Sequence, residues 1–252
     1  MGRSLVNYFA VAHPSQPNYI AQIGGSTLGV TGDGVYNLPQ SNLVDLMETK
    51  GVSWKTYQEN YPGNCDPSAY LPATNPLYYR KHNPFISFDN IRTNAVRCAK
   101  IVNSAQLDID LANAAFPQYS YYTPNINNDA HNTNITYAGL WLDNFLSLRL
   151  SKFPANTFVV VTWDEDDYTE ANQVLTFFLD PTGSLFKQGS VDNTLYNHYS
   201  LLATIEQNWG QLFVYNNLPY VLIVLFSFGQ SRSLRLKCYH FYLELDQARG
   251  VN

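Results

Sequence analysis

The sequence has few charged residues and no long hydrophobic run. Only 14% of its 252 residues are Asp, Glu, Lys or Arg, the net charge is −5, and no basic run occurs. A nucleic-acid partner is therefore not expected. No stretch reaches the ~18 apolar residues of a membrane span, and Tyr220–Phe228 is too short, so no stable membrane span is expected. The first residues also lack the apolar run of a signal peptide.

Cysteine is scarce, which limits the chain to one disulfide and one remaining thiol. Of Cys65, Cys98 and Cys238, the first two lie in polar, loop-like contexts, and we expect them to pair in an oxidising compartment. The 19 Tyr, 14 Phe and frequent Asn are typical of a secreted protein. Asn134-Ile135-Thr136 is the one glycosylation sequon, a short motif that often occurs by chance.

Strand-like and helix-like segments alternate along the chain without internal repeats. This order predicts one large α/β domain with a mostly parallel sheet and helices on both faces. Strands are expected at 7–12, 52–57, 119–122, 158–161 and 174–179, and helices at 17–23, 43–47, 107–115, 135–150 and 201–209. Segment 60–91, rich in Pro, Asn and Tyr, is expected to be irregular.

Helix caps and buried faces follow from residue types and their spacing. Ser41 is expected to cap the helix at 43–47, and Ser15 or Gln16 the helix that begins near Pro17. In the helix at 135–150, the residues expected to point inward are Leu140, Trp141, Phe145 and Leu148.

An acidic run follows the most convincing strand. Phe158–Val161 has the continuous apolar character of a strand buried on both faces, and Asp164, Glu165, Asp166 and Asp167 come directly after it. Ligands of open α/β sheets bind beyond the carboxyl ends of strands. Adjacent acids repel one another unless some face water or hold a cation, so the run indicates either a solvated turn or a cation site.

Other chemically active residues fall at predicted strand ends and helix starts. Ser15 begins a helix, where backbone N–H groups could hold a phosphate, although an ordinary capping serine is the alternative. Arg80–His82 is a compact positive cluster that is either plain surface or faces an anionic substrate. Further oxygen and imidazole groups at predicted strand ends are Asn18, Asp129, His131 and His198. Hydroxyl, carboxylate and imidazole groups together suit metal-assisted phosphoryl transfer.

Five segments in order resemble the motifs of the fungal phosphoesterase family: NYFAVAHPSQPNYIAQIGGS, RKHNPF, NDAHNTNITYAGLW, TWDED and YNHYS…IEQNWG. The resemblance covers roughly residues 6–210. That family contains secreted acid phosphatases, is related to bacterial phospholipases C, and belongs to the alkaline-phosphatase-like superfamily. The resemblance implies that superfamily's fold, a small phosphate-ester substrate, a secreted location and a divalent metal ion of unknown identity.

The resemblance also implies roles for individual residues. Ser15 would be the nucleophile and a metal ligand, Asn18 would hold the phosphoryl oxygens, and Asp164 and Glu165 would be metal ligands.

The histidines and the remaining aspartate have broader implied roles. His131 and His198 would contact phosphate, transfer a proton or ligate a second metal. Asp129 and His82 would contact the substrate, with a structural role in their loops as the alternative.

The two ends of the chain depart from the family pattern. The family begins with a strand that ends in a metal-ligating Glu-Asn pair, and Gly2–Val6 do not replace it. After Gly210 the polar ending is replaced by an apolar, strand-like piece and a basic tail. We therefore divide the chain into a phosphoesterase domain at 1–210, lacking its first strand, and a divergent tail at 211–252.

Three functions are compatible with this sequence. The first is a metal-dependent phosphomonoesterase that acts through a phosphoserine at Ser15. The second is a phospholipase C or another phosphodiesterase, and the third is a catalytically impaired remnant that only binds anions or a partner. Little turnover is expected from the chain as given, because the Glu-Asn pair is missing.

Overall fold

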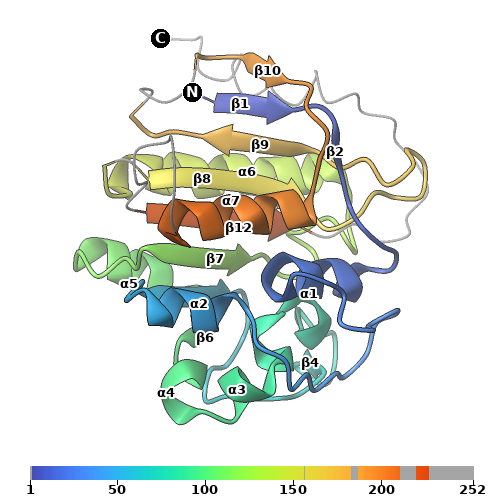
Figure 1. Ribbon diagram of the computed structural model, residues 1–252, viewed down its shortest axis with the longest axis vertical. Coiled ribbons are helices and arrows are strands. Elements are labelled where there is room, and N and C mark those ends of the chain that lie inside the picture. The colour runs from blue at the N-terminus through green and yellow to red at the C-terminus, as the bar shows by residue number, and fades with distance from the viewer. Residues whose placement is uncertain (1, 156, 183–186, 211–219, 227–252) are drawn as a thin grey trace.

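A largely parallel sheet forms the centre of the protein. The structure, a computed structural model, describes residues 2–155, 157–182, 187–210 and 220–226. Eight strands lie in the order β10-β1-β9-β8-β12-β7-β3-β6 (Figure 1). Their bounds are β1 (Gly2–Leu5), β3 (Trp54–Gln58), β6 (Ile101–Asn103), β7 (Tyr119–Thr123), β8 (Thr157–Trp163), β9 (Thr176–Leu179), β10 (Ser190–Asp192) and β12 (Tyr220–Phe226). Neighbours from β8 to β6 are parallel, and β9 runs antiparallel to both β8 and β1.

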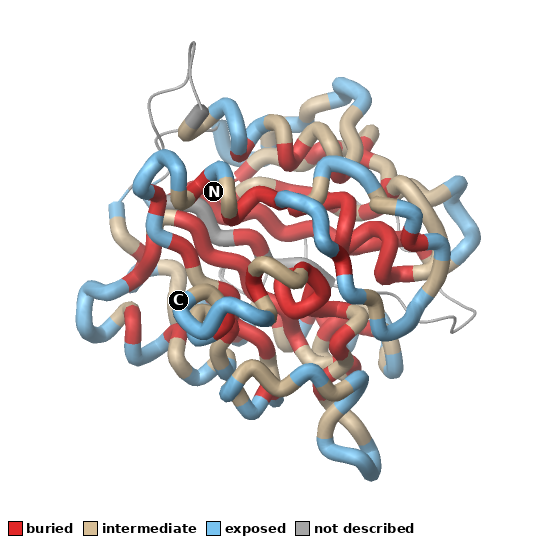
Figure 2. Tube along the Cα trace, turned by 60° about the horizontal axis from the view of Figure 1, so that its bottom comes forward, coloured by how far each residue is buried: buried red, intermediate tan, exposed pale blue. Residues whose placement is uncertain are grey.

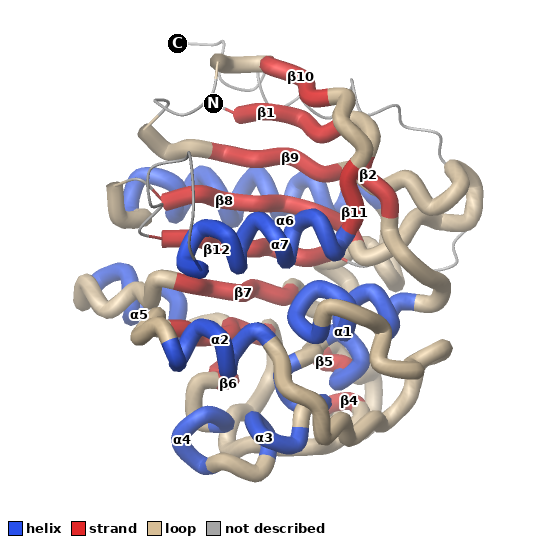
Figure 3. The backbone as a smooth tube through the Cα atoms, viewed as in Figure 1, coloured by secondary structure: helices blue, strands red, loops and turns tan. Residues whose placement is uncertain are grey.

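Helices cover both faces of the sheet, as the alternating pattern predicts. The helices α1 (Ser15–Gly24), α2 (Leu43–Thr49) and α7 (His198–Gly210) pack together on one face, and α6 (Ile135–Arg149) lies on the other (Figures 1 and 3). Shorter helices are α3 (Asp89–Arg92), α4 (Ala95–Cys98), α5 (Gln106–Ala112), η1 (Arg80–His82), η2 (Phe85–Ser87) and η3 (Leu150–Lys152). Two small sheets pair β2 (Tyr8–Phe9) with β11 (Tyr196–Asn197), and β4 (Tyr70–Leu71) with β5 (Tyr78–Tyr79).

Strand β8 runs through the core and ends at the acidic run. All of its residues are buried, because it has a strand on either side and helices on both faces (Figure 2). The predicted strand at 158–161 is therefore confirmed, and it is longer than its apolar part. Thr157 and Thr162 extend it because Thr157 Oγ1 donates to Pro154 O and the hydroxyl of Thr162 pairs with that of Thr176.

Strand β12 comes from the segment that the sequence places in the divergent tail. It lies between β8 and β7 and runs parallel to both, with Ile223 opposite Val160 and Tyr121. Ile223 is buried. The predicted boundary at residue 210 therefore separates two elements of one α/β unit. Strand β1, by contrast, lies next to the edge strand β10.

Several local predictions are wrong. The strand expected at 7–12 is reduced to β2, because Asn18 holds the backbone of the next residues away from strand pairing. Segment 60–91 is not irregular, since it contains the hairpin β4–β5 and the short helices η1, η2 and α3. Asn42 caps α2 in place of Ser41, because its side chain accepts from Val44 N while Asp45 accepts from Asn42 N. In α1 the cap position is Pro14, so Ser15 is the first helical residue.

The predicted inward face of α6 is right for Phe145, which is buried, and for Trp141, which packs against the core, but it is wrong for Leu140 and Leu148. Leu140 and Leu148 are 71% and 51% exposed, while Ala138, Leu142 and Phe145 are buried. Small residues face the sheet at the start of this helix because they allow a close approach, and counting large apolar side chains missed that face.

Two further expectations concern the whole chain. The Cys65–Cys98 disulfide is present, with the two Cα atoms 5.6 Å apart, so that prediction is confirmed. Among the described residues, no helix is long and apolar enough to cross a membrane.

A buried ionic cluster joins α5 to β3. Asp110 Oδ2 accepts from Lys55 Nζ at 2.5 Å and from the Tyr57 hydroxyl at 2.6 Å, while Gln106 donates to the other oxygen. Burial alone would raise the pKa of Asp110, but the hydrogen bonds from these three residues and the Lys55 charge outweigh it and lower the pKa.

Candidate active site

Ser15 and Glu165 meet at the carboxyl end of β8. The Ser15 hydroxyl donates to Glu165 Oε1 at 3.0 Å, and both residues are almost fully buried. Ser15 is the first residue of α1, so it also lies at the positive end of that helix. The structure thus brings together a hydroxyl, a carboxylate and a helix N-terminus, although 150 residues separate Ser15 from Glu165 in the chain.

The charge state of Glu165 is strongly perturbed. Burial raises the pKa of Glu165 to about 8, and the Ser15 hydrogen bond and the Lys81 charge only partly oppose this effect. The neighbouring charges of Asp33 and Asp166 raise it further. A buried carboxyl in this setting would gain from a nearby positive charge.

His13 is a site residue that sequence reasoning missed. Its Nδ1 lies 2.5 Å from Glu165 Oε2, and its Nε2 lies 3.1 Å from Asp166 Oδ1. The ring stacks on Tyr168, with centroids 4.0 Å apart. His13 therefore holds the Glu165 oxygen that Ser15 does not contact. Its position two residues before Ser15 was the feature of the sequence that could have identified it as a site residue.

The acidic run divides into residues with different surroundings. Asp164, Glu165 and Asp166 are buried, and Asp167 is half-buried. Asp164 Oδ1 accepts from the Glu165 backbone N–H at 2.8 Å. Asp166 accepts from the backbone N–H groups that follow it and so shapes its own turn. The run is therefore not a simple solvated turn.

His198 is fully buried beneath the acidic run. Its Nε2 donates to the Asp164 carbonyl at 2.7 Å, so its Nδ1 is the acceptor for the Tyr8 hydroxyl and the Gln22 amide. Tyr121 in turn donates to Gln22 Oε1. Burial lowers the pKa of His198 to about 4, which favours the neutral ring. The network ties β7, α1 and α7 to the end of β8.

The side chain of Asn18 forms hydrogen bonds with the backbone of the preceding segment. Its Oδ1 accepts from Val11 N and Ala12 N, and its Nδ2 donates to Ala12 O at 2.8 Å. It holds the segment that leads into Ser15, and one amide hydrogen remains beyond these three bonds. The structure places Asn18 one helical turn after Ser15 but uses most of its polar atoms for the backbone.

His82 and Asp129 form a buried pair on the neighbouring loops. His82 Nδ1 lies 3.1 Å from Asp129 Oδ2, and the His82 ring stacks on Tyr19 with centroids 5.0 Å apart. Burial moves the pKa of Asp129 well above its ordinary value and that of His82 well below, so the pair is favoured in its neutral form. His82 Nε2 is buried with no hydrogen-bond partner.

The members of the positive cluster Arg80–His82 have different surroundings. Arg80 is buried and donates to backbone carbonyls, including Pro67 O and Tyr36 O. Lys81 instead points toward the site, where its Nζ lies 3.1 Å from His131 Nε2. Burial, followed by the Lys81 charge, lowers the pKa of His131. A neutral His131 accepts from Lys81.

The hydroxyl oxygen of Ser15 and the carboxylate oxygens of Glu165 are the types of ligand that a hard divalent cation prefers. Two oxygens bound to one cation at 2.0–2.1 Å in adjacent octahedral positions are about 3.0 Å apart, which matches the Ser15 Oγ to Glu165 Oε1 distance of 3.0 Å. Among the described residues, however, no group of three or more His, Cys, Asp or Glu side chains is arranged to hold a metal. The Ser15 hydroxyl and the Glu165 carboxylate are the pair of oxygen donors that the structure places 3.0 Å apart.

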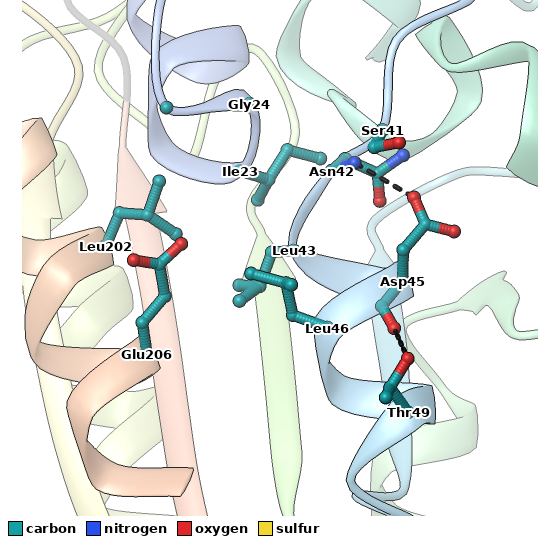
Figure 4. A pocket seen from close by; sticks show the side chains of 11 residues that line it. Ile23, Gly24, Ser41, Asn42, Leu43, Asp45, Leu46, Thr49, Leu202 and Glu206 are labelled. Atoms are coloured by element: carbon teal, nitrogen blue, oxygen red, sulfur yellow. Dashed lines mark hydrogen bonds between the residues drawn. The ribbon is translucent and has the colours of Figure 1, made fainter. Parts of the chain in front are cut away.

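A separate pocket lies at the other end of α1. Its volume is about 280 Å³, and Ile23, Leu43, Leu46 and Leu202 line it, with Glu206 at its side (Figure 4). A rise of 1.5 Å per residue places this end of α1 about 13 Å from Ser15, so the pocket is not part of the Ser15 site.

Comparison with known proteins identifies relatives that match most of the chain. The model of the phosphoesterase family matches residues 5–212. A phosphate-repressible acid phosphatase of Penicillium chrysogenum is 41% identical over 215 residues, covering 83% of this chain and 52% of that protein. An acid phosphatase of Aspergillus niger is 38% identical over 217 residues, with 83% and 52% covered.

A bacterial protein is also similar over the same part of the chain. A phosphatidylinositol-3-phosphatase of Mycobacterium tuberculosis is 31% identical over 214 residues, covering 83% of this chain and 67% of that protein. The chain spans about half the length of the fungal relatives. On the match over most of its length, the chain belongs to the phosphoesterase family.

Proposed function

We propose that this chain forms the core of a metal-dependent phosphomonoesterase of the alkaline-phosphatase-like superfamily, and that Ser15 is its nucleophile. The observation that carries the proposal is the hydrogen bond from Ser15 Oγ to Glu165 Oε1 at the start of α1. The sheet supports the superfamily assignment, because its parallel strands carry the acidic run at a carboxyl end.

The positions of Ser15 and Glu165 support the following reaction. Ser15 Oγ attacks phosphorus, the bond from phosphorus to the ester oxygen breaks, and the alcohol leaves with a proton from solvent. The Ser15 proton moves toward Glu165 Oε1, which already accepts it. Water then hydrolyses the phosphoserine and releases inorganic phosphate.

The surrounding residues orient these groups. His13 fixes the second oxygen of Glu165, and His198 fixes the backbone of Asp164. The network around His198 gives it a positioning role, since both of its nitrogens face protein partners. The remaining hydrogen of Asn18 Nδ2 is its available donor to a phosphoryl oxygen.

A divalent cation would be held by Ser15 Oγ, Glu165 and Asp164. When bound, it would supply positive charge to the serine oxygen and to the phosphoryl oxygens.

The names of the relatives favour a phosphomonoester as the substrate class, since all of those described above are phosphatases. A small soluble ester and a lipid headgroup both present that group. A secreted location agrees with the disulfide.

Hydrolysis of p-nitrophenyl phosphate by the full chain tests the proposal, with bis(p-nitrophenyl) phosphate as the diester. We expect turnover to be low, the monoester to be preferred over the diester, EDTA to abolish the turnover and a divalent metal to restore it. Ser15→Ala should lower kcat/KM by at least about a thousandfold. Ser147→Ala, on the exposed side of α6, is the matched control and should change nothing.

Three results would contradict parts of this proposal. Preference for the diester would favour a phosphodiesterase. Turnover that survives Ser15→Ala would exclude the nucleophile. Phosphate binding without turnover in any metal would favour the impaired remnant.

A further inference from the structure

A glycine-rich loop segment lies across the start of α1. This segment, Thr31–Val35, is called the strap here. One end follows Val30, which is buried, and the other precedes Tyr36, whose carbonyl accepts from buried Arg80 at 2.7 Å. The strap is thus anchored at both ends, and most of its residues are exposed.

The middle of the strap places a carboxylate against the start of α1. Asp33 Oδ1 accepts from the Gln16 backbone N–H at 3.0 Å, and Asp33 Oδ2 accepts from Lys81 Nζ at 2.7 Å. A backbone N–H beside the nucleophile and an ammonium group are the donors that a phosphate oxygen would need. Asp33 therefore has the position and charge of a bound anion.

A buried amide donor and a buried imidazole nitrogen nearby lack hydrogen-bond partners. Gln16 is fully buried, and its Oε1 accepts from Gly34 N at 2.7 Å, which fixes the orientation of the amide. Its Nε2 then has no hydrogen-bond partner. His82 Nε2, on the ring next to His131, is likewise buried and unpaired. A buried unpaired donor is costly, and an oxygen of an incoming anion would satisfy Gln16 Nε2, as well as His82 Nε2 in the tautomer that carries its proton there.

The charges around Ser15 make Lys81 important for an anionic substrate. Glu165, Asp129 and Asp33 are all acids, and the charge of Lys81 acts on the first two. In the structure that charge is directed to Asp33. The ammonium group of Lys81 can therefore neutralise a phosphate at Ser15 only when it turns from Asp33 to the phosphate.

We propose that Asp33 is an internal competitor of the substrate: it occupies an anion subsite formed by Gln16 and Lys81, and a phosphate group must displace it and the strap. The subsite would take the phosphate of a monoester or inorganic phosphate. This inference rests on the proposed function for its substrate class, but its test needs only binding.

Titration calorimetry of inorganic phosphate with the full chain, without any ester, tests the competition. Asp33→Asn removes the competing charge and should tighten phosphate binding by about fivefold, the worth of a partly exposed ion pair. Lys81→Met should weaken binding by about tenfold, because it removes a charge-assisted hydrogen bond. Asp108→Asn is the matched control, since Asp108 is exposed and pairs with Arg149, and it should leave binding unchanged.

The double variant separates competition for Lys81 from a general effect of the Asp33 charge. If Asp33 competes for Lys81, Asp33→Asn should give no gain in the Lys81→Met background. An equal gain in both backgrounds, or no gain from Asp33→Asn in either, would overturn the proposal. Absence of phosphate binding by Asp33→Asn would overturn the subsite itself.

Hydrogen exchange tests the displacement of the strap directly. Phosphate should speed amide exchange in the strap, because Gly34 N–H loses its acceptor on Gln16 when the strap moves. Unchanged or slower exchange at saturating phosphate would show that Asp33 stays in place. Phosphate affinity and amide exchange are both measured without hydrolysis. A chain without enzyme activity could therefore still confirm or contradict the competition by Asp33.

Discussion

His198→Ala is the substitution that most directly tests whether the buried network supports the site. The His198 ring is fully buried and joins the Asp164 carbonyl to Tyr8 and Gln22. Truncation removes the packing of the ring and leaves a buried carbonyl without its donor. A cavity of this kind together with orphaned polar groups should lower the free energy of unfolding by about 3–5 kcal/mol.

Urea denaturation at neutral pH, followed by tryptophan fluorescence, measures this loss. His198→Gln is the informative second variant, because a glutamine amide can still donate to the Asp164 carbonyl. We expect it to recover about half of the lost stability. Leu195→Ala, at a side chain that is 69% exposed, is the control and should change stability by less than about 0.5 kcal/mol. A cost for His198→Ala as small as that of the control would refute the positioning role.

Three further predictions concern stability. Asp110→Asn should lower the free energy of unfolding by about 2–4 kcal/mol at neutral pH, since it weakens the buried pair with Lys55. Because the folded pKa of Asp110 is lowered, the wild-type advantage is present above the ordinary aspartate pKa and should shrink as pH falls through the folded pKa. Urea denaturation of both proteins at two pH values measures this change. Reducing the Cys65–Cys98 disulfide, which spans 33 residues, should cost about 3–4 kcal/mol, and thiol counting on the unreduced, denatured chain should find one free thiol instead of three. Asn42→Ala should cost about 1 kcal/mol through loss of the α2 capping box, read from the midpoint of urea unfolding.

The sequence predicts the central strands well because burial on both faces leaves an unmistakable apolar run. Strand β8 is an example, whereas the long helix α6 was found from its amphipathic pattern. The buried face of α6 was found only in part: Phe145 is buried as expected, but Leu140 and Leu148 are apolar and exposed. Small residues at a close contact carry no such signal.

The candidate site was predictable in part. Ser15 and Glu165 were identified from residue type, position and family motifs, and the structure brings them within 3.0 Å. His13, Asp33 and Gln16 were not identified, because their importance arises from contacts between distant parts of the chain. Sequence spacing gives no information on which loop crosses the start of a helix.

The position of β12 could not be predicted for a related reason. Its apolar composition indicated a strand, but composition does not say which neighbours a parallel strand will choose. Its place between β7 and β8 depends on long-range pairing.

Trapping the phosphoenzyme is the most direct test of the central claim that Ser15 attacks phosphorus. The full chain would be mixed with a phosphate-labelled monoester and divalent metal, quenched in acid and digested, and the labelled peptide identified by mass spectrometry. We predict that the label is on Ser15 and that Ser15→Ala carries none. Label on another residue, label that persists in Ser15→Ala, or hydrolysis without any labelled Ser15 would contradict the account.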